Sequence, residues 1–213
     1  MKITIFGATG NIGRRVVAEA LSRGHEVTAL GRDATKLQSL PERVTARTGD
    51  VGDARHVATL SEGQDLVINA TRPTSGGVDE VVAMTQGLMD GLDETGTRVL
   101  LVGGAATLRV PGAGGKTVLQ DARFLPVKAR HVGQMSARQY AVCRAETRVN
   151  WAYLCPPANL TPGVRTGRYR LGSDELLLDA SGHSRLSMED LAVVLLDEAE
   201  QPQHRQVRFT AAY

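Results

Sequence analysis

The segment Phe6-Gly7-Ala8-Thr9-Gly10-Asn11-Ile12-Gly13 decides the fold of this chain. Its three glycines recur at every third residue, directly after a strand-like run over residues 2–6 and directly before a helical pattern over residues 12–23. A glycine triplet by itself is weak evidence, but a strand, a turn and a helix in this order are the context in which it binds a dinucleotide. The alternative is a glycine-rich turn that packs a helix against a strand and binds nothing.

Each glycine of this segment has a separate physical task. Gly7 allows a tight turn, Gly10 has no side chain to keep a phosphate from the backbone, and Gly13 lets the helix pack closely on the strand. The N–H groups of Asn11 and Ile12 would then point at a pyrophosphate, at the positive end of the helix dipole. The segment therefore predicts a phosphate-binding turn.

Strand-like runs and helical patterns alternate along most of the sequence. The predicted strands cover residues 2–6, 26–30, 44–48, 65–69, 98–102, 150–154 and 207–210. The predicted helices cover residues 12–23, 34–40, 53–60, 78–94 and 131–148, and a last helix begins after Ser187, where Asp190 completes a capping-box pattern. This alternation predicts an α/β fold in which helices cover both faces of a doubly wound parallel sheet, the Rossmann fold.

The chain shows no repeat, low-complexity run or linker, so we expect residues 1–213 to form a single domain. Residues 103–127 hold several glycines and two prolines and predict a long loop. Residues 160–186 are irregular in pattern, with short strand candidates at 168–170 and 175–178. We expect residues 156–186 to be a small elaboration on the substrate side of the domain.

The composition excludes several classes of protein. The 213 residues are 42% hydrophobic and 23% charged, which is ordinary for a globular domain. Lys and Arg number 25 and Asp and Glu number 23, so the net charge of +2 lacks the basic excess of a nucleic-acid-binding domain. No run approaches the length of apolar sequence that a membrane span needs. We therefore expect neither a nucleic acid nor a membrane as partner.

The cysteines, the histidines and the first residues bear on the compartment and on metals. Cys143 and Cys155 cannot make a disulfide scaffold and fit a reducing compartment. The beginning of the chain lacks the apolar core and cleavage site of a signal peptide. The five histidines are scattered, without zinc-site spacing. We expect a cytoplasmic protein without a metal site.

The end of the second predicted strand indicates which nucleotide is bound. An NAD enzyme places a carboxylate there for the ribose 2′-hydroxyl, whereas this chain has Leu30-Gly31-Arg32-Asp33. Gly31 does not repel a 2′-phosphate, and the guanidinium of Arg32 can donate several hydrogen bonds to it. NADP(H) is therefore favoured over NAD(H), although Asp33 weakens the argument and Arg32 could be a solvated surface residue.

The glycine spacing resembles that of the short-chain dehydrogenase/reductase superfamily, and Gly-Ala-Thr-Gly-x-Ile-Gly resembles its extended and atypical branches. Three later segments match that superfamily in order, each at the end of a predicted strand: Gly49-Asp50-Val51, Asn69-Ala70-Thr71 and Gly103-Gly104-Ala105. The resemblance implies that they reach the adenine, the cofactor ribose and the nicotinamide. The residues expected to bind the cofactor are Gly7, Thr9, Gly10, Asn11, Ile12, Gly13, Arg32, Asp50, Val51, Asn69, Ala70, Thr71, Gly103 and Gly104.

The catalytic residues typical of that superfamily are not where the resemblance implies. Its members carry a Ser near the end of strand five and a Tyr-x-x-x-Lys pair, but this chain has Gly103-Gly104-Ala105-Ala106 at the strand end. Tyr140 is followed at the fourth position by Arg144 and lies only ten residues before Asn150, so we expect it not to be catalytic. Lys128 and His131 lie closer to the expected position and remain the candidates, beside the simpler interpretation that both are solvated.

The missing pair fits a narrower resemblance. The chain looks like the atypical NAD(P)H-binding family that includes NmrA-like proteins, the biliverdin reductase B type and bacterial NADH-flavin reductases. The segments that carry this resemblance run from Gly7-Ala8-Thr9-Gly10 through Asn150-Trp151-Ala152-Tyr153-Leu154-Cys155-Pro156-Pro157 to Ser187-Met188-Glu189-Asp190-Leu191-Ala192, and so span the whole chain.

Three functions remain open from the sequence. The first is an NADPH-dependent reductase that passes hydride to a flavin, a quinone-like molecule or another easily reduced small-molecule acceptor, with solvent as proton source. The second is a non-catalytic NADP(H)-sensing protein, and the third is a nucleotide-sugar epimerase or dehydratase. Arg165, Arg168 and Arg170 form either a solvated face or a rim that attracts an anionic acceptor. We expect a monomer or a homodimer.

Overall fold

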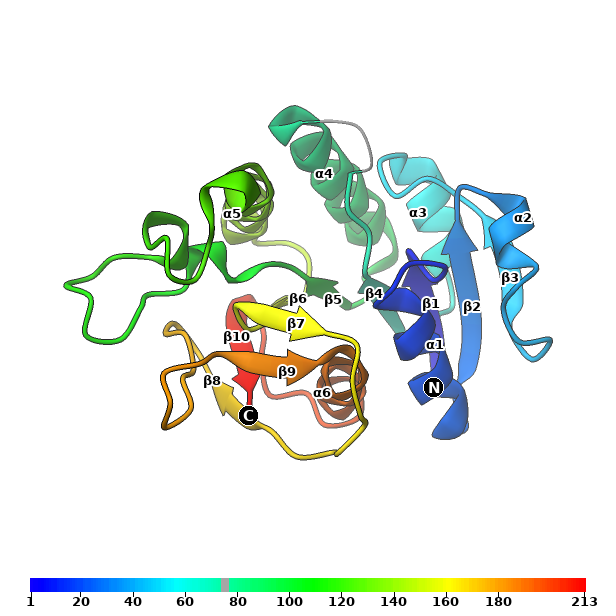
Figure 1. The fold of residues 1–213 in the computed structure, drawn as a ribbon. Coiled ribbons are helices and arrows are strands. Elements are labelled where there is room, and N and C mark those ends of the chain that lie inside the picture. Colours follow the sequence, from blue (N-terminus) through cyan, green and yellow to red (C-terminus); the bar gives the residue numbers. More distant parts are fainter. Residues whose placement is uncertain (74–76) are drawn as a thin grey trace.

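Parallel strands form the centre of the molecule in the computed structural model, which describes residues 1–73 and 77–213 (Figure 1). Within these residues an eight-stranded sheet has the order β3-β2-β1-β4-β5-β6-β10-β8. The strands are β1 (Lys2–Phe6), β2 (Glu26–Gly31), β3 (Thr45–Thr48), β4 (Leu66–Asn69), β5 (Val99–Val102), β6 (Trp151–Cys155), β8 (Arg170–Gly172) and β10 (Val207–Ala212). The helices are α1 (Gly13–Ser22), α2 (Ala34–Leu37), α3 (Ala54–Ser61), α4 (Val78–Thr95), α5 (Arg130–Ala145) and α6 (Met188–Glu200). The predicted doubly wound sheet is confirmed.

Helices cover both faces of this sheet. Figure 1 shows α1 and α6 below it and α3, α4 and α5 above it. Successive side chains of a strand point to opposite faces, so Leu100 packs into the core beneath α1 and α6, while Leu101 packs into the core beneath the other helices. Both faces of β5 are buried, which explains why its sequence is continuously apolar.

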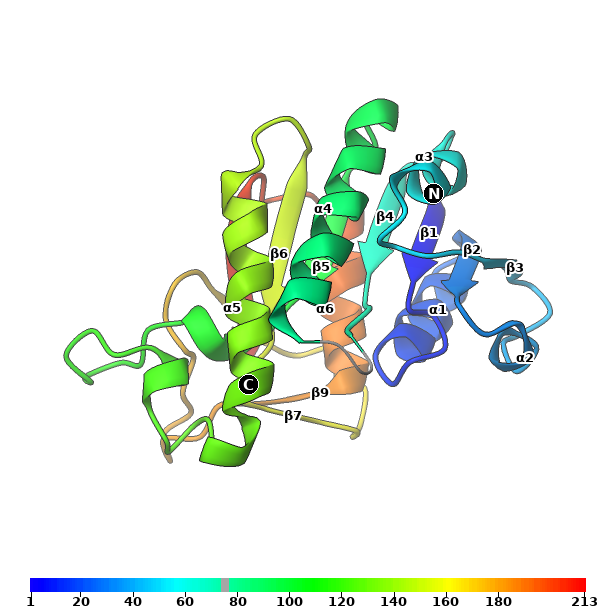
Figure 2. The same cartoon turned by 90° about the horizontal axis from the view of Figure 1, so that it is seen from above.

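The order β3-β2-β1-β4-β5 fixes the place of a ligand site. The chain runs outward from β1 to β3 and then returns to β4 on the other side of β1, so the crossover direction reverses beside β1. In such sheets ligands bind beyond the carboxyl ends of the strands at this reversal. Figure 2 shows the turn between β1 and α1, the strands of the C-terminal elaboration and the beginning of α5 along one edge of the sheet.

The segment after β5 differs in detail from the predicted loop. It contains three short 3₁₀ turns, η1 (Ala105–Thr107), η2 (Val118–Gln120) and η3 (Val127–Ala129). In the elaboration, β7 (Asn159–Thr161) pairs with β9 (Arg185–Ser187), and β8 joins the edge of the main sheet antiparallel to β10. The strand candidate at 175–178 is wrong, since only Glu175 forms a bridge there, with Arg109.

The start of α6 departs from the predicted capping box. Ser187 caps the helix, since its hydroxyl accepts the N–H of Asp190 at 2.9 Å. The carboxylate of Asp190 does not return to the cap. It is fully buried and accepts hydrogen bonds from the N–H groups of Thr166 and Gly167 at 2.8 Å and from the hydroxyl of Tyr213 at 2.7 Å. Asp190 thus anchors the elaboration to the last helix.

Candidate functional site

A cavity of about 780 Å³ opens at the carboxyl ends of β1, β2, β3 and β4. It lies where the crossover direction reverses, the place at which this class of sheet binds ligands. Its lining includes the predicted residues Gly7, Thr9, Gly10, Asn11, Ile12, Arg32, Asp50, Val51, Ala70 and Thr71. The remaining lining residues are Phe6, Arg14, Leu30, Gly31, Asp33, Lys36, Gly49, Arg72, Met84 and Met188. The structure thus brings ten of the fourteen predicted residues around one cavity.

Glycine is required at Gly7 and Gly13 by close backbone contacts. Gly7 has φ +77°, and a Cβ there would lie 2.8 Å from the carbonyl of Ala70. A Cβ at Gly13 would lie 2.0 Å from the oxygen of Gly7, so Gly13 supports the turn from beneath and does not line the cavity. The turn is also tied to β2, because the N–H groups of Gly7 and Ala8 both donate to the carbonyl of Leu30. The glycines therefore let the turn pack between β2 and the end of β4.

The beginning of α1 offers hydrogen-bond donors to the cavity. Among the described residues, the N–H groups of Asn11 and Ile12 have no acceptor within the protein. Ile12 occupies the N-cap position and supplies no side-chain cap. A helix of this length adds its dipole to these donors, and the combination attracts an anion. The turn fits the pyrophosphate of a dinucleotide.

Four basic residues line the same cavity: Arg14, Arg32, Lys36 and Arg72. Arg14 donates from its guanidinium to the carbonyl of Thr9 at 3.1 Å, which places its charge beside the glycine turn. Asp33 is also present, but its carboxylate accepts the N–H groups of Thr35 and Lys36 and so caps α2. Of these four residues, the sequence pattern predicts only Arg32. Arg14, beside Gly13, and Arg72, beside Thr71, could have been found as cations next to predicted site residues.

Asn69 does not line the cavity but holds Thr71, which does, through hydrogen bonds. Its side chain is buried at 2% exposure, and its Oδ1 accepts the N–H of Thr71 at 3.1 Å and the hydroxyl of Thr71 at 2.7 Å. These bonds shape the bend after β4 that brings Ala70 and Thr71 to the cavity. On the other side of β2, Asp50 accepts the N–H of Gly52 at 2.9 Å, which makes a tight turn after β3. Both polar residues order the loops that surround the cavity.

Gly103 and Gly104 lie outside this cavity, at the end of β5. A Cβ at Gly103 would lie 1.9 Å from the ring of Tyr153, and a Cβ at Gly104 would lie 2.7 Å from the side chain of Ser136 on α5. The hydroxyl of Tyr153 donates to the carbonyl of Ser136 at 3.0 Å. Glycines here therefore let α5 and β6 close over the end of β5, and their predicted contact with a cofactor stays a prediction.

The three residues considered for catalysis occupy different surroundings. Lys128 lies in η3 and His131 in the first turn of α5, and both are exposed and away from the cavity lining. Tyr140 lies deeper along α5. Its ring centroid is 5.2 Å from that of Tyr153, and the guanidinium of Arg208 lies over it at 5.0 Å. Burial raises the pKa of Tyr140 above its usual value, which does not suit a phenol that must lose a proton.

Two other expectations concern metals and membranes. In residues 1–73 and 77–213, no group of three or more His, Cys, Asp and Glu side chains could hold a metal ion. Across the same residues, none of the helices has the length and apolar character to cross a membrane.

Comparison with known proteins places these features in context. A family model described as NAD(P)H-binding matches residues 7–202. The crystal structure of a candidate exported protein from Burkholderia pseudomallei is 37% identical, with all of both chains covered and a TM-score of 0.88. A candidate epimerase from Bacteroides thetaiotaomicron is 36% identical, with 100% of this chain and 96% of that chain covered and a TM-score of 0.89. A candidate NADH-flavin reductase from Streptococcus pneumoniae is 26% identical, with coverage of 100% and 99% and a TM-score of 0.84.

Proposed function

This chain belongs to the NAD(P)H-binding family, and from that membership we propose that it is a reductase that uses NADPH to reduce a flavin or a quinone-like acceptor. The observation that carries the proposal is the cavity at the glycine turn, where unpaired N–H groups and four basic residues surround space for a dinucleotide phosphate. The name of the Streptococcus pneumoniae protein supports a flavin as acceptor.

The basic residues favour NADPH over NADH. Arg32 follows β2 directly, at the position where NAD enzymes hold the ribose 2′-hydroxyl with a carboxylate. The carboxylate of the next residue, Asp33, caps α2 and lies 3.6 Å from the ammonium of Lys36. A 2′-phosphate at this end of the cavity would meet Arg32 and Lys36, whose charges together exceed that of Asp33.

The chain's own residues would position the reactants and exclude water. The turn at Gly7 and the basic residues would hold the phosphates, while the bend fixed by Asn69 would hold the cofactor along the strand ends. When bound, NADPH supplies a hydride, which is two electrons and one proton, and the reduced acceptor takes its second proton from water. No tyrosine of the sequence is followed at the fourth position by Lys, so a Tyr-x-x-x-Lys pair is missing. An acceptor that needs no placed acid is therefore the one that suits this chain.

A turnover assay tests the proposal. NADPH oxidation should be measured with FMN, riboflavin and a simple quinone, and we expect catalytic turnover with at least one of them. Tight NADPH binding with no turnover for any acceptor would favour the NADP(H)-sensing alternative. The name of the Bacteroides thetaiotaomicron protein favours a third candidate, an epimerase. An epimerase would convert a nucleotide sugar while its cofactor is recovered unchanged.

A further inference from the structure

Positive charge is concentrated in the segment that follows β5. Residues 103–138 contain six basic residues (Lys and Arg) and one acidic residue, an Asp. In the whole chain the two signs are nearly balanced, with 25 basic and 23 acidic residues. This segment leaves the sheet at Gly103 and leads into α5, and Figure 1 shows it extending outward beyond the sheet. Its basic residues are Arg109, Lys116, Arg123, Lys128, Arg130 and Arg138.

Within the described residues, only Arg109 and Arg123 of these six cations form an ion pair, with Glu175 and Asp121. Arg123 is paired with Asp121, whose carboxylate accepts hydrogen bonds from its guanidinium. In the described ranges, neither Lys128 nor Arg130 has an ion pair, and both side chains are exposed. Exposed cations without an ion-pair partner attract anions and remain available to a ligand.

The packing of α5 places these charges beyond the end of β5. Ser136 lies against Gly104, where an added Cβ would be 2.7 Å away, and Gly133 lies against Leu125, where an added Cβ would be 2.5 Å away. The first turns of α5 are therefore fixed above the strand end. One turn before Ser136, on the same side of the helix, Val132 leaves 52% of its surface exposed.

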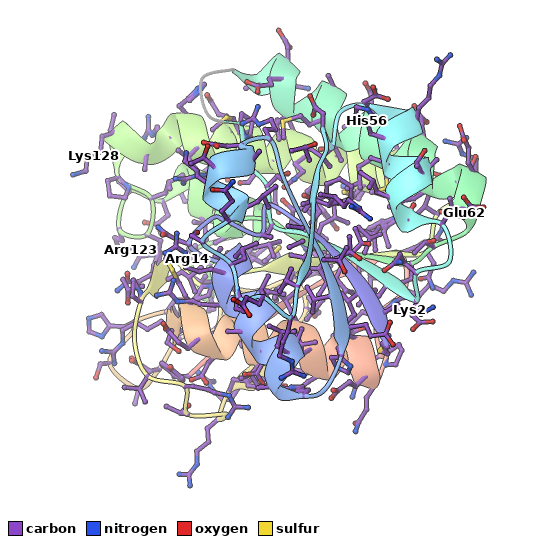
Figure 3. All side chains as sticks on the ribbon, turned by 90° about the vertical axis from the view of Figure 1, so that its right-hand side faces the viewer. Lys2, Arg14, His56, Glu62, Arg123 and Lys128 are labelled. Atoms are coloured by element: carbon purple, nitrogen blue, oxygen red, sulfur yellow. The ribbon has the colours of Figure 1, made fainter. Side chains whose placement is uncertain are left out.

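An exposed apolar and basic strip thus lies at the start of α5, one turn before Ser136, the residue that packs against Gly104. The strip consists of Val127, Lys128, Arg130 and Val132, and the two valines are 68% and 52% exposed. Figure 3 shows Lys128 and Arg123 on the same side of the molecule as Arg14, which lines the cavity, and opposite to Lys2. The strip and the cavity therefore share one edge of the sheet.

The arginines of the elaboration are less available to bind an anionic ligand than Lys128 and Arg130. Arg165 donates two hydrogen bonds of 2.8 Å to the carboxylate of Glu19, a side chain with 6% exposure. The guanidinium of Arg170 donates to the carbonyl oxygens of Leu178 and Tyr213. The guanidinium groups of Arg165 and Arg170 thus donate within the protein, and a basic rim at residues 165–170 stays a prediction.

We infer that the acceptor is anionic, and that Lys128 and Arg130 bind its phosphate or carboxylate while Val132 contacts its ring system beside Gly104. The inference rests on the proposed function for the role of this molecule as an acceptor. It predicts that an acceptor with a phosphate or carboxylate binds more tightly than an uncharged acceptor with the same ring system. The reason is that Lys128 and Arg130 contact the charged group and not the ring. The interaction is exposed and should weaken as salt screens it.

FMN and riboflavin are matched probes, since they share one ring system and differ by a phosphate. At low ionic strength we expect a KM for FMN at least five times lower than that for riboflavin, and 0.5 M NaCl should remove most of this difference. Flavin fluorescence quenching should give the same order of affinities for the protein saturated with NADP⁺. This binding measurement decides the inference even if no acceptor is turned over, an outcome that would reject only the proposed reductase activity.

The variant Lys128→Glu/Arg130→Glu tests the two residues directly. Acidic residues are favourable at the start of a helix, so the protein should fold. We expect the KM and the dissociation constant for FMN to rise about tenfold, with less than a twofold change for riboflavin. The matched control is Lys2→Glu/Arg205→Glu, which makes the same change in net charge at exposed residues beside the opposite ends of the strands.

Two results would overturn the inference. One is equal affinity of the unmodified protein for FMN and riboflavin at low ionic strength. The other is an equal loss of FMN affinity in the variant and in its control, which would assign the effect to net charge and not to this strip.

Discussion

The Nε atom of Arg15 lies 2.6 Å from Oε1 of Glu189, and this ion pair joins the first turn of α1 to the first turn of α6. Arg15 also donates from its guanidinium to the carbonyl of Asn11 at 2.6 Å. The other oxygen of Glu189 accepts the N–H of Gly163 at 2.7 Å. The two side chains are 21% and 24% exposed, so water screens their attraction only in part. One short chain of contacts therefore runs from the phosphate-binding turn to the elaboration.

Glu189→Gln should weaken NADPH binding about fivefold, which corresponds to roughly 1 kcal/mol for a partly buried ion pair. The expected cause is a less ordered Asn11 carbonyl and a freer Gly163 segment. Titration with NADPH and hydrogen exchange at Gly163 would measure the two effects. Glu26→Gln, at an exposed position, is the control and should change neither. Unchanged affinity together with faster exchange would show that the elaboration does not act on the turn.

Arg32→Ala should weaken NADPH binding by about 10- to 100-fold and NADH binding by less than about twofold, because hydrogen bonds to charged groups contribute roughly 1.5–3 kcal/mol. Only NADPH carries the 2′-phosphate that Arg32 is proposed to hold. Dissociation constants for both nucleotides would measure this difference. Arg43→Ala removes an equal charge from an exposed position outside the cavity lining and should affect neither. An equal loss for both nucleotides would reject the assignment of the phosphate to Arg32.

Gly13→Ala should destabilise the protein by about 3 kcal/mol or prevent its folding, since overpacking a tight contact costs roughly 1–3 kcal/mol or more. The added Cβ would lie 2.0 Å from the oxygen of Gly7 and would push the glycine turn outward. Thermal unfolding and NADPH titration would measure the effect. The same substitution at Gly77, where an added Cβ meets nothing within 4 Å, should be tolerated. Normal nucleotide binding in Gly13→Ala would contradict the tight turn.

Tyr140→Phe should leave turnover within about twofold of the unmodified protein, because the ring packs between Tyr153 and Arg208 and its hydroxyl is not proposed to transfer a proton. Tyr153→Phe is the matched comparison. It removes the hydrogen bond to the carbonyl of Ser136 and should lower stability by about 1 kcal/mol. Steady-state rates and melting temperatures would separate the two variants. A thousandfold fall in turnover for Tyr140→Phe would show that this phenol is catalytic.

Asp190 should make stability fall in acid. Burial acts to raise the pKa of Asp190, but the hydrogen bonds donated by Thr166, Gly167 and Tyr213 outweigh it and hold the pKa below its usual value. A carboxyl whose folded pKa is depressed stabilises the protein above its unfolded pKa of about 4, and this contribution is lost as the pH falls through the folded pKa. The elaboration should therefore loosen below about pH 4.

The measurement is melting temperature against pH for the unmodified protein and for Asp190→Asn. The variant should be less stable by about 2–4 kcal/mol at pH 7, because buried donors lose a charged acceptor, and its melting temperature should vary less in acid. Glu42→Gln, at an exposed position, should retain the full acid dependence. Identical acid profiles for Asp190→Asn and the unmodified protein would assign the dependence to other carboxyls, such as Glu19.

The sequence predicted the sheet well because its central strands are buried on both faces. A run such as Val99–Val102 is apolar at every position, and the seven predicted strands form within two residues of their predicted ends. The elaboration was harder to predict, since β7, β8 and β9 have three residues each. Strands this short carry too little periodicity to be distinguished from loops.

A local sequence pattern gave a wrong prediction where a side chain forms its hydrogen bonds with residues that are distant in the sequence. The spacing of Ser187 and Asp190 indicates a capping box, yet Asp190 receives its hydrogen bonds from Thr166, Gly167 and Tyr213, which are distant in sequence. Three arginines in residues 165–170 look alike in the sequence, but Arg165 is held by Glu19 from α1. Tertiary packing determines which residues form these hydrogen bonds, and a local sequence pattern cannot predict them.

The sequence by itself determined the glycine turn, the parallel sheet and the position of Arg32 after the second strand. These follow from local rules, because a turn with positive φ needs glycine and a strand covered on both faces needs continuous apolar residues. Only the tertiary structure decided that Arg14, Lys36 and Arg72 share a cavity with Arg32, and that Ser136 of α5 packs against Gly104. The physical reason is that parallel strands end at one edge, where residues far apart in the chain meet.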